Sequence, residues 1–408
     1  MFDPQPKATA FRPCVPYQRK RLRLRLRVKQ ALWFATGLTE THLDSVSDNR
    51  DSPRGLTLSG CCCARSEAAQ TTISRTFLPA MPSEDRYLVT GAGGFIGSHL
   101  VEALLRRGHR VRAFVRYTSN ANKGWLDDIS PDLKERLEFF HGDIADGRAV
   151  MEASRGCSRI FHLAALIGIP YSYVAPQSYV TVNVQGTLNV LEAARTHQLE
   201  RCIVTSTSEV YGTALYTPID EKHPLQGQSP YSATKIGADH IALSYHKAFD
   251  LPVTVVRPFN TFGPRQSTRA IIPTIITQAL QRDVIEVGSR TPVRDMVFVE
   301  DTANGFIECG ESEACIGEVT NLATNVGVSI GDLIDRIQSL AGTSLPVTER
   351  DERKRPEKSE VFTLLGSAEL AKERCGWTPQ VTLDEGLQRT IDWFRNSQPR
   401  DDVGEYRV

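Results

Sequence analysis

Long hydrophobic runs are absent from this 408-residue sequence, and so is an excess of charge of either sign. No apolar run approaches the roughly 20 residues that a membrane-spanning helix needs, so we expect a soluble protein with no membrane partner. The formal net charge is +0, and no global field favours nucleic acid as a partner. The remaining composition, 40% hydrophobic and 24% charged, is typical of a globular chain with one large or two interleaved domains.

Cysteine pairs at metal-binding or redox spacing are also missing. No C-x-x-C pair occurs, and an odd number of cysteines in a long chain does not describe a disulfide framework. The nine are Cys14, Cys61, Cys62, Cys63, Cys157, Cys202, Cys309, Cys315 and Cys375. We therefore expect buried, reduced thiols in a cytoplasmic protein, and no metal site.

The first 80 residues show neither helical nor strand periodicity. They hold 13 Lys/Arg against 6 Asp/Glu, so this leader is basic and the remainder is mildly acidic. The Arg-Leu run from Arg19 to Lys29 has three interpretations: a nucleic-acid patch, a targeting segment, or translated sequence upstream of a functional start at Met81. We expect residues 1–80 to be disordered or outside the functional protein.

From Met81 onward, short apolar strands alternate with helices. We expect strands at residues 86–90, 111–115, 137–141, 159–163, 201–206 and 253–257, and helices at about 94–107, 182–196 and 232–249. This alternation predicts an α/β fold, a doubly wound, Rossmann-like parallel sheet with helices on both faces. We expect a dinucleotide-binding domain at 81–260, a smaller, interleaved mixed α/β substrate-binding region at 261–398, and a tail at 399–408.

A glycine-rich turn follows the first expected strand. The segment TGAGGFIG places Gly91, Gly94 and Gly97 between a strand and a helix, at the spacing of a dinucleotide-binding loop. Glycine permits a tight turn and close approach of the backbone to a pyrophosphate, and the helix directs its first N–H groups at the phosphates. We expect these glycines, with Phe95 and Ile96 of the same segment, to bind the dinucleotide.

The end of the second expected strand bears on the choice between NAD and NADP. No carboxylate stands there for a ribose hydroxyl, whereas Arg116 is suited to a 2′-phosphate, so the sequence favours NADP over NAD. The alternative is that Arg116 is a solvated surface charge. Asp143 and Ile144 follow the third strand, where they are placed to reach the adenine; alternatively, Asp143 caps a helix.

Tyr231 and Lys235, in the segment YSATK, lie four residues apart on an expected helix and therefore share one face. An ammonium beside a phenol favours the phenolate and lowers the pKa of the tyrosine. Tyr231 is thus a candidate general base for a sugar hydroxyl. By itself the pattern is common on exposed helix faces, but here it follows both a dinucleotide loop and a strand that ends in Ser and Thr.

The segments TGAGGFIG, TSTSEVYG, YSATK and RPFNTFGPR, in this order, resemble the extended short-chain dehydrogenase family of nucleotide-sugar epimerases, dehydratases and decarboxylases. The resemblance covers roughly residues 84–398. Longer stretches, such as IPYSYVAPQSY and RPEKSEV, look most like the 4,6-dehydratases that act on nucleotide-linked N-acetylglucosamine in legionaminic acid-type synthesis. The resemblance implies a tightly held NAD(P), a nucleotide-sugar substrate and a homodimer.

The same resemblance assigns catalytic roles around TSTSEVYG. Thr207 matches the hydroxyl that hydrogen-bonds the sugar O4, and Glu209 matches the carboxylate that removes the C5 proton in dehydratases. Ser208 stands where many glucose-nucleotide dehydratases have an aspartate, so Glu209 is expected to serve as both base and acid. The alternatives are a UDP-glucuronate decarboxylase, a 4-epimerase, and a dinucleotide-binding scaffold protein without catalysis.

Three further residues match substrate-binding positions of the family. Asn260 matches the residue near the substrate diphosphate, and Arg294 and Arg355 match arginines that hold the diphosphate or ribose. Guanidinium groups suit phosphate oxygens because they donate two parallel hydrogen bonds. The alternative for each arginine is a surface ion pair.

Overall fold

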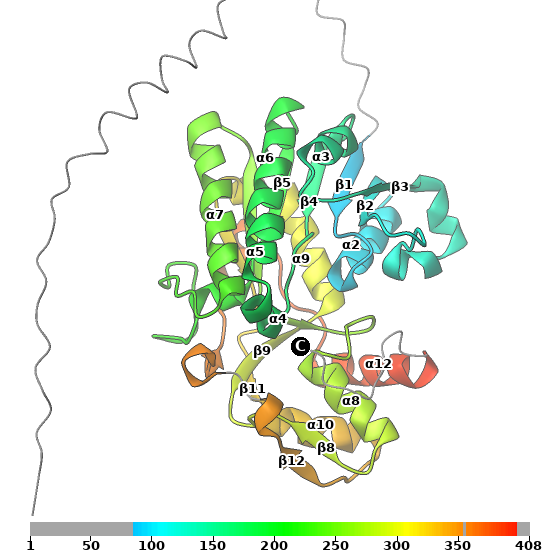
Figure 1. Cartoon of the computed structure of the whole chain (residues 1–408), viewed down its shortest axis with the longest axis vertical. Coiled ribbons are helices and arrows are strands. Elements are labelled where there is room, and N and C mark those ends of the chain that lie inside the picture. Colours follow the sequence, from blue (N-terminus) through cyan, green and yellow to red (C-terminus); the bar gives the residue numbers. More distant parts are fainter. Residues whose placement is uncertain (1–84, 354–355, 398–408) are drawn as a thin grey trace, which may run out of the picture. The chain divides into compact units, whose positions relative to one another are not determined.

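The computed structural model describes residues 85–353 and 356–397, shown in colour in Figure 1. The predictions for the leader, for Met81, for Arg355 and for the tail at 399–408 lie outside the described residues. In the part described, no helix is long and apolar enough to cross a membrane.

Seven parallel strands form the main sheet, in the order β10-β6-β5-β4-β1-β2-β3. Their bounds are β1 (Arg86–Thr90), β2 (Arg110–Arg116), β3 (Leu137–Gly142), β4 (Arg159–His162), β5 (Arg201–Thr205), β6 (Val253–Pro258) and β10 (Val319–Leu322). The six predicted strands are confirmed, and β10 is an addition from the C-terminal region. The strand order reverses between β1 and β4, and ligands of such sheets bind at that point, beyond the carboxyl ends of the strands.

Helices cover both faces of this sheet (Figure 1). On one face, Val89 and Phe161 pack with α2 (Phe95–Arg106) and α9 (Val299–Glu311). On the other, Leu88 and Ile160 pack with α3 (Gly147–Ser154) and α6 (Gly186–Thr196), which lies beside α7 (Pro230–Phe249). Neighbouring residues of one strand serve opposite cores because strand side chains alternate, and burial on both faces explains the nearly continuous apolar strands. The predicted doubly wound fold is confirmed.

The segment between β4 and α6 differs most from the prediction. Two short helices, α4 (Ile169–Val174) and α5 (Pro176–Tyr179), were not predicted, and each has a proline in its first turn. A π-helical turn, η3 (Val180–Gln185), then runs into α6, where the sequence predicted one regular helix from 182. Short helices that begin at prolines carry too few residues to show helical periodicity. Single π-turns often occur at functional sites.

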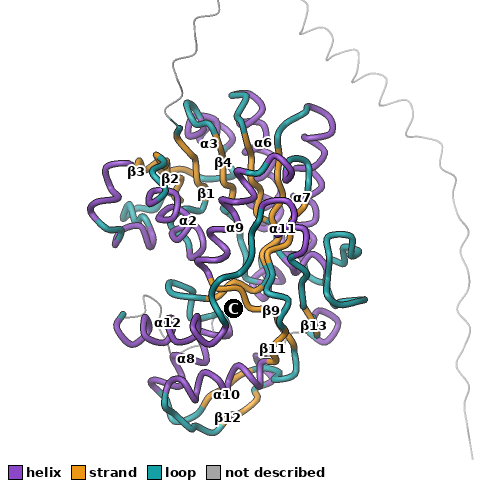
Figure 2. The backbone as a smooth tube through the Cα atoms, turned by 180° about the vertical axis from the view of Figure 1, so that it is seen from behind, coloured by secondary structure: helices purple, strands orange, loops and turns teal. Residues whose placement is uncertain are grey.

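The C-terminal region adds two smaller sheets and its own core (Figure 2). One sheet contains β7 (Asn260–Phe262), β9 (Val293–Phe298), β11 (Gly327–Ser329) and β13 (Thr363–Leu364); the other contains β8 (Ile285–Val287) and β12 (Val347–Glu349). The helices of this region are α8 (Ile271–Gln281), α10 (Ile330–Ala341), α11 (Glu369–Cys375) and α12 (Leu383–Asn396). Because α9 and β10 return to the main sheet, the two regions are interleaved.

The loop after β7 forms hydrogen bonds and an ion pair with α2, the helix that follows the glycine turn. The Arg265 guanidinium lies 2.6 Å from the Glu102 carboxylate and donates to the Ser98 hydroxyl at 3.2 Å. The His99 ring also contacts the Pro264 carbonyl oxygen at 3.1 Å. Glu102 and Arg265 are both largely buried, so the pair fixes the loop after β7 against α2.

Candidate active site

The glycine turn has the geometry that a bound pyrophosphate requires. Gly91 has a φ of 69°, and a Cβ there would lie 2.7 Å from the Ala164 nitrogen. A Cβ on Gly97 would lie 2.2 Å from the Gly91 oxygen. The first backbone bond of α2 runs from Ser98 N–H to the Gly94 carbonyl, so the preceding amides, those of residues 95–97, face the helix N-terminus. The cradle fits a dinucleotide, and the binding roles of these residues stay predictions.

Gly97→Ala should disrupt this cradle. The added methyl group cannot coexist with the Gly91 carbonyl oxygen, so we expect dinucleotide affinity to fall by more than about tenfold, or about 1.4 kcal/mol. Calorimetric titration of the apoprotein with NAD and NADP measures the effect. Gly331→Ala in α10 is the matched control, because a Cβ there lies no closer than 3.6 Å to a neighbour. Unchanged affinity in Gly97→Ala would show that the turn does not hold the dinucleotide.

The structure also places the three residues predicted to lie near the adenosine part of the dinucleotide. Arg116 ends β2 and is exposed, as both of its interpretations require. Asp143 accepts a hydrogen bond from Ala145 N–H at 2.9 Å, whereas the cap of α3 is Asp146, so the alternative of Asp143 as a helix cap is wrong. Ile144 is buried in the core beneath α6.

Helix α7, which carries Tyr231 and Lys235, begins earlier than the sequence predicted. Ser229 caps α7 and exchanges hydrogen bonds with Ser232 in a capping box, at 3.1 and 3.0 Å. Pro230 occupies the first turn, where its missing N–H costs nothing. Tyr231 therefore lies in the first turn of α7 and Lys235 one turn later. Both side chains are buried.

Lys235 does not act on Tyr231 as the sequence predicted. Its ammonium donates to the Thr205 carbonyl oxygen at the end of β5. Burial lowers the pKa of Lys235 to about 8, opposed by the charge of Asp239. Burial also raises the pKa of Tyr231 above its ordinary value, a hydrogen bond with Thr207 opposes this, and the charge of Glu209 adds to it. In this arrangement the phenol is held protonated.

The buried Lys235 gives a testable pH dependence of stability. Its pKa is lowered from 10.5 to about 8 on folding, so between those values the unfolded chain binds more protons. The free energy of unfolding should therefore rise with pH across this window. We expect the wild type to gain on the order of 3 kcal/mol relative to Lys235→Met as the pH rises through this window. Urea denaturation at both ends measures the gain, and Lys247→Met, an exposed site on α7, is the control. An equal pH dependence in wild type and Lys235→Met would contradict the account.

A network of buried, hydrogen-bonded polar side chains lies next to Lys235 on α7. The carboxylate of Asp239 lies 2.9 Å from the Arg257 guanidinium and accepts from the Ser206 hydroxyl at 2.7 Å. Arg257 also donates to the Tyr211 hydroxyl at 2.9 Å, and that hydroxyl donates to Asn321 at 2.7 Å. Four elements are thus joined beneath Lys235. Asp239 was not predicted from the sequence, although its position four residues after Lys235 places both side chains on the same face of the helix.

The segment after β5 brings the predicted catalytic residues together. Thr207 caps the short helix η4 (Ser208–Tyr211), and its hydroxyl accepts from Glu209 N–H at 3.2 Å. Ser208 is buried, and Glu209 is half-buried. Glu209 is close enough for its charge to raise the pKa of Tyr231. A hydroxyl, a carboxylate and a phenol therefore converge beyond the carboxyl end of β5.

Two residues of the unpredicted segment also shape the site. The Tyr179 ring is buried and meets the Tyr231 ring edge to face, with centroids 6.3 Å apart. Asn183, in the π-helical turn, accepts from Leu166 N–H at 2.8 Å and donates to the Thr234 hydroxyl at 3.1 Å. It thereby ties the loop after β4 to α7. No spacing rule identifies either residue.

The substrate-side predictions are placed as follows. The Asn260 Oδ1 is buried and has no hydrogen-bond partner among the described residues, as expected of an atom that awaits a ligand. Arg294 is buried and lies 3.3 Å from the Glu360 carboxylate, so it forms a buried ion pair and not the surface pair that was the alternative to its binding role. Arg355 is outside the described residues.

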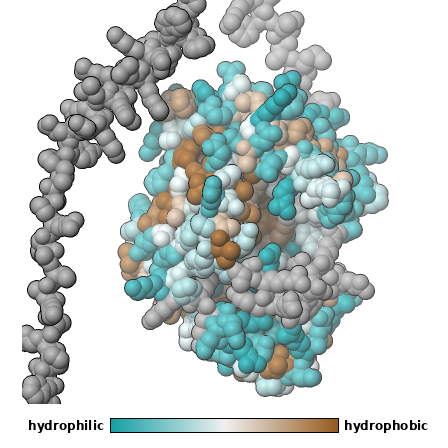
Figure 3. Space-filling view, viewed as in Figure 1, coloured by the Kyte–Doolittle hydropathy of each residue, from teal (hydrophilic) through white to brown (hydrophobic). Residues whose placement is uncertain are grey.

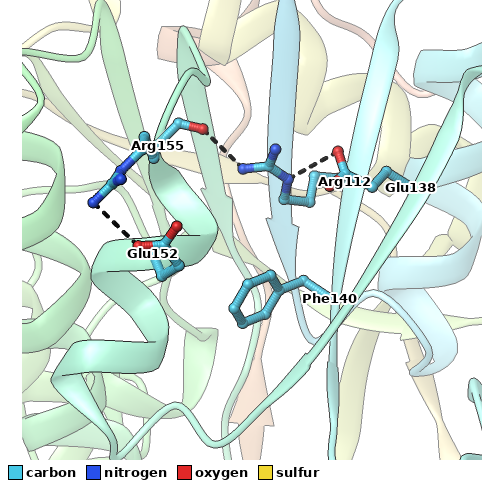
Figure 4. Close-up of a pocket in the computed structure, with 5 residues that line it drawn as sticks. All are labelled: Arg112, Glu138, Phe140, Glu152 and Arg155. Atoms are coloured by element: carbon cyan, nitrogen blue, oxygen red, sulfur yellow. Dashed lines mark hydrogen bonds and ion pairs between the residues drawn. The ribbon is translucent and has the colours of Figure 1, made fainter.

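A pocket elsewhere in the main sheet does not belong to this site. It is lined by Arg112, Glu138, Phe140, Glu152 and Arg155. As Figure 4 shows, its charged groups pair with one another: Arg112 lies 3.0 Å from Glu138 and donates to the Arg155 carbonyl oxygen at 2.8 Å. Because these charged groups pair with one another, we assign no ligand to this pocket.

Apolar side chains are exposed beside the candidate site. Ile167, Val174 and Val180 are 69%, 70% and 52% exposed. Figure 3 shows apolar surface on the side where α4 to α7 lie, above a largely polar C-terminal region. The homodimer implied by the resemblance stays a prediction.

Comparison with known proteins identifies the class. The family model described as GDP-mannose 4,6 dehydratase matches residues 88–390, well over half of the chain. The chain therefore belongs to this family of NAD-dependent epimerases and dehydratases, the extended short-chain dehydrogenases. It is a nucleotide-sugar epimerase or 4,6-dehydratase.

Three relatives of known activity are similar to this chain over about three quarters of its length. A UDP-glucose 4-epimerase of Mycolicibacterium smegmatis is 34% identical over 76% of this chain and 99% of its own length. A dTDP-glucose 4,6-dehydratase of Streptomyces antibioticus is 32% identical over 76% and 92%. The solved UDP-glucuronic acid 4-epimerase of Bacillus cereus, in complex with UDP-glucuronic acid and NAD, is 30% identical over 76% and 99%, with a TM-score of 0.70. The prediction of NADP over NAD receives no support from these relatives.

Proposed function

We propose that this protein is a nucleotide-sugar 4,6-dehydratase that makes a 4-keto-6-deoxy sugar nucleotide, from UDP- or GDP-N-acetylglucosamine. The observation that carries the proposal is the carboxylate of Glu209 beside Tyr231 and Thr207. An epimerase needs the phenol and the hydroxyl, but elimination of water also needs a group that removes the C5 proton. Glu209 is that group.

The first step is removal of the O4 proton. Tyr231 is the base, because its phenol and the Thr207 hydroxyl lie within hydrogen-bonding reach of each other and can both contact one sugar oxygen. The raised pKa of Tyr231 makes the neutral phenol its resting form, so Tyr231 has to release this proton to water before it can accept the O4 proton. In the structure the ammonium of Lys235 donates to the Thr205 carbonyl oxygen, so it favours the phenolate only after it turns toward Tyr231; the charge of Asp239 supports the charge of Lys235.

When bound, a dinucleotide, which we take to be NAD, would supply the hydride chemistry: acceptance of a hydride from C4 and its return, at C6 in a dehydratase. The glycine cradle before α2 would hold its pyrophosphate. Arg116 is then a surface charge at the end of β2. The prediction of NADP depends on that arginine. Titration of the apoprotein with NAD and with NADP shows which of the two binds more tightly.

The elimination is assigned to Glu209. A ketone at C4 acidifies the C5 proton, because the resulting enolate delocalises onto the carbonyl oxygen. Glu209 takes this proton and passes a proton to the C6 hydroxyl, which leaves as water. Ser208, buried next to Glu209, lacks a carboxylate, so one residue performs both transfers. Asn260, with its unpaired buried oxygen, is assigned to the substrate diphosphate, and Arg294 and Arg355 to the diphosphate or ribose.

A second candidate is 4-epimerisation. The observation that favours it is Ser208. Many glucose-nucleotide dehydratases of the family have an aspartate at this position, and this chain does not. A 4-epimerase would use Thr207, Tyr231 and Lys235 in the same roles, and Glu209 would have no proton to move. A UDP-glucuronate decarboxylase shares the early steps and loses carbon dioxide in place of water.

Product analysis tests the proposal. The full chain is incubated separately with UDP-N-acetylglucosamine, GDP-N-acetylglucosamine and UDP-glucuronate, and the products are weighed by mass spectrometry. We expect an acetylamino-sugar nucleotide to lose the mass of one water molecule. Loss of carbon dioxide from UDP-glucuronate, or an isomer of unchanged mass found by chromatography, would overturn the proposal.

A further inference from the structure

Two cysteines six residues apart and a third that is distant in sequence meet near the amino end of β10, a strand of the main sheet. Cys309 lies in the last turn of α9, Cys315 ends the short helix η5 (Glu313–Cys315), and Cys375 ends α11. Their sulfur atoms all lie within 4.8 Å of one another. Helices α9 and α11 are in contact (Figure 2). Cys315 precedes β10, so the group is at the amino end of this strand, whereas Tyr231 lies beyond the carboxyl ends.

The spacing of the sulfurs matches that of ligands of one metal ion. The Cys309 Sγ lies 3.7 Å from the Cys375 Sγ. Thiolates bound to tetrahedral Zn²⁺ at about 2.3 Å lie about 3.8 Å apart. Zinc thiolates therefore fit this pair with little movement, and Cys315 would approach by less than about 1 Å.

The surroundings hold the three segments in place. The Ser312 hydroxyl, between Cys309 and Cys315, donates to the Arg374 carbonyl oxygen at 2.6 Å, next to Cys375. Arg201, which is buried, donates to the Ser312 carbonyl oxygen at 3.1 Å and lies 2.7 Å from the Glu313 carboxylate. These contacts join the ends of α9 and α11 before any metal binds.

Access and ligand type also suit a cation bound by thiolates. Cys309 and Cys315 are fully buried, but Cys375 is half-buried, so an ion has an approach on that side. Soft thiolate ligands select ions such as Zn²⁺ over Mg²⁺ or Ca²⁺.

We propose that Cys309, Cys315 and Cys375 together bind one thiophilic divalent cation of the Zn²⁺ type. Three thiols each lose a proton, three metal–sulfur bonds form, and one water molecule stays bound on the side of Cys375 as the fourth ligand. The ion would fix α9, α11 and the entry to β10 to one another. The sequence predicted no metal site because the three cysteines do not form a C-x-x-C pair, and Cys375 lies 60 positions after Cys315.

Metal analysis of the full chain tests the site, with Zn²⁺ as the probe. Cys61→Ser, Cys62→Ser and Cys63→Ser are combined as the background, because adjacent thiols in the leader are a second source of zinc binding. After reduction and equilibration with Zn²⁺, we expect one bound ion per chain by mass spectrometry of metals. Cys375→Ser in this background should weaken binding by more than about tenfold. Cys157→Ser, another buried thiol, should leave it unchanged.

Cobalt(II) substitution adds a readout that depends on the ligands. Thiolate-to-cobalt charge-transfer bands should appear in the background protein and should weaken in Cys309→Ser, Cys315→Ser and Cys375→Ser. Since Cys375 is half-buried, its variant should keep the wild-type melting temperature without metal, so lost binding there is not lost folding. Absence of bound zinc in the background protein, equal binding in Cys375→Ser, or a Cys309–Cys375 disulfide in metal-free protein under reducing conditions would overturn the proposal.

Discussion

Tyr231→Phe should abolish oxidation of the sugar at C4, with turnover reduced by about 10²–10⁴-fold, the range of a lost general base. The phenol is the titratable group that shares a hydrogen bond with Thr207, and phenylalanine keeps the ring contact with Tyr179 while removing the proton acceptor. Single-turnover absorbance of the reduced dinucleotide measures this step directly, before any later step intervenes.

Tyr245→Phe is the matched control for this experiment. It makes the same chemical change on the same helix, but the Tyr245 hydroxyl donates to Glu192, away from the site. We expect its turnover to match that of the wild type. If Tyr231→Phe still reduced the bound dinucleotide at the wild-type rate, another group would have to remove the O4 proton.

Glu209→Gln should separate oxidation from elimination. The amide keeps the size of the side chain but cannot accept the C5 proton, so C4 oxidation should proceed while loss of water slows by about 10²–10⁴-fold. Reduced dinucleotide and 4-keto sugar should accumulate together. Stopped-flow absorbance combined with quenched product analysis follows both species.

The control and the rival outcomes make this test decisive. Glu200→Gln changes an exposed carboxylate just before β5 and should leave turnover intact. Full dehydration by Glu209→Gln would remove Glu209 from the mechanism. In a 4-epimerase the Gln variant would keep its epimerisation rate, because no C5 proton moves in that reaction.

Local sequence patterns were enough to predict six of the seven strands of the main sheet and the glycine turn. Residues 86–97 form a strand, a turn and a helix whose glycines are required by contacts within the same segment, such as that between Gly97 and Gly91. The pair Tyr231 and Lys235 is likewise set by helical spacing alone. These features depend on neighbours a few residues away, so a sequence shows them.

Features that depend on distant partners were not predictable in the same way. The direction of the Lys235 ammonium depends on the Thr205 carbonyl, and the charge of Asp239 on α7 is balanced by Arg257 on β6. The sequence therefore predicted the wrong influence on the pKa of Tyr231. The cysteine cluster and strand β10 were missed for the same reason, since their partners lie far along the chain.

The central claim is that hydride leaves C4 and returns at C6, and isotope position tests it most directly. UDP- and GDP-N-acetylglucosamine labelled with deuterium at C4 are converted by the full chain, and nuclear magnetic resonance locates the label in the product. We expect a product that has lost one water molecule and carries deuterium on C6. Deuterium at C4 of an isomer with unchanged mass would contradict this claim and identify the protein as a 4-epimerase.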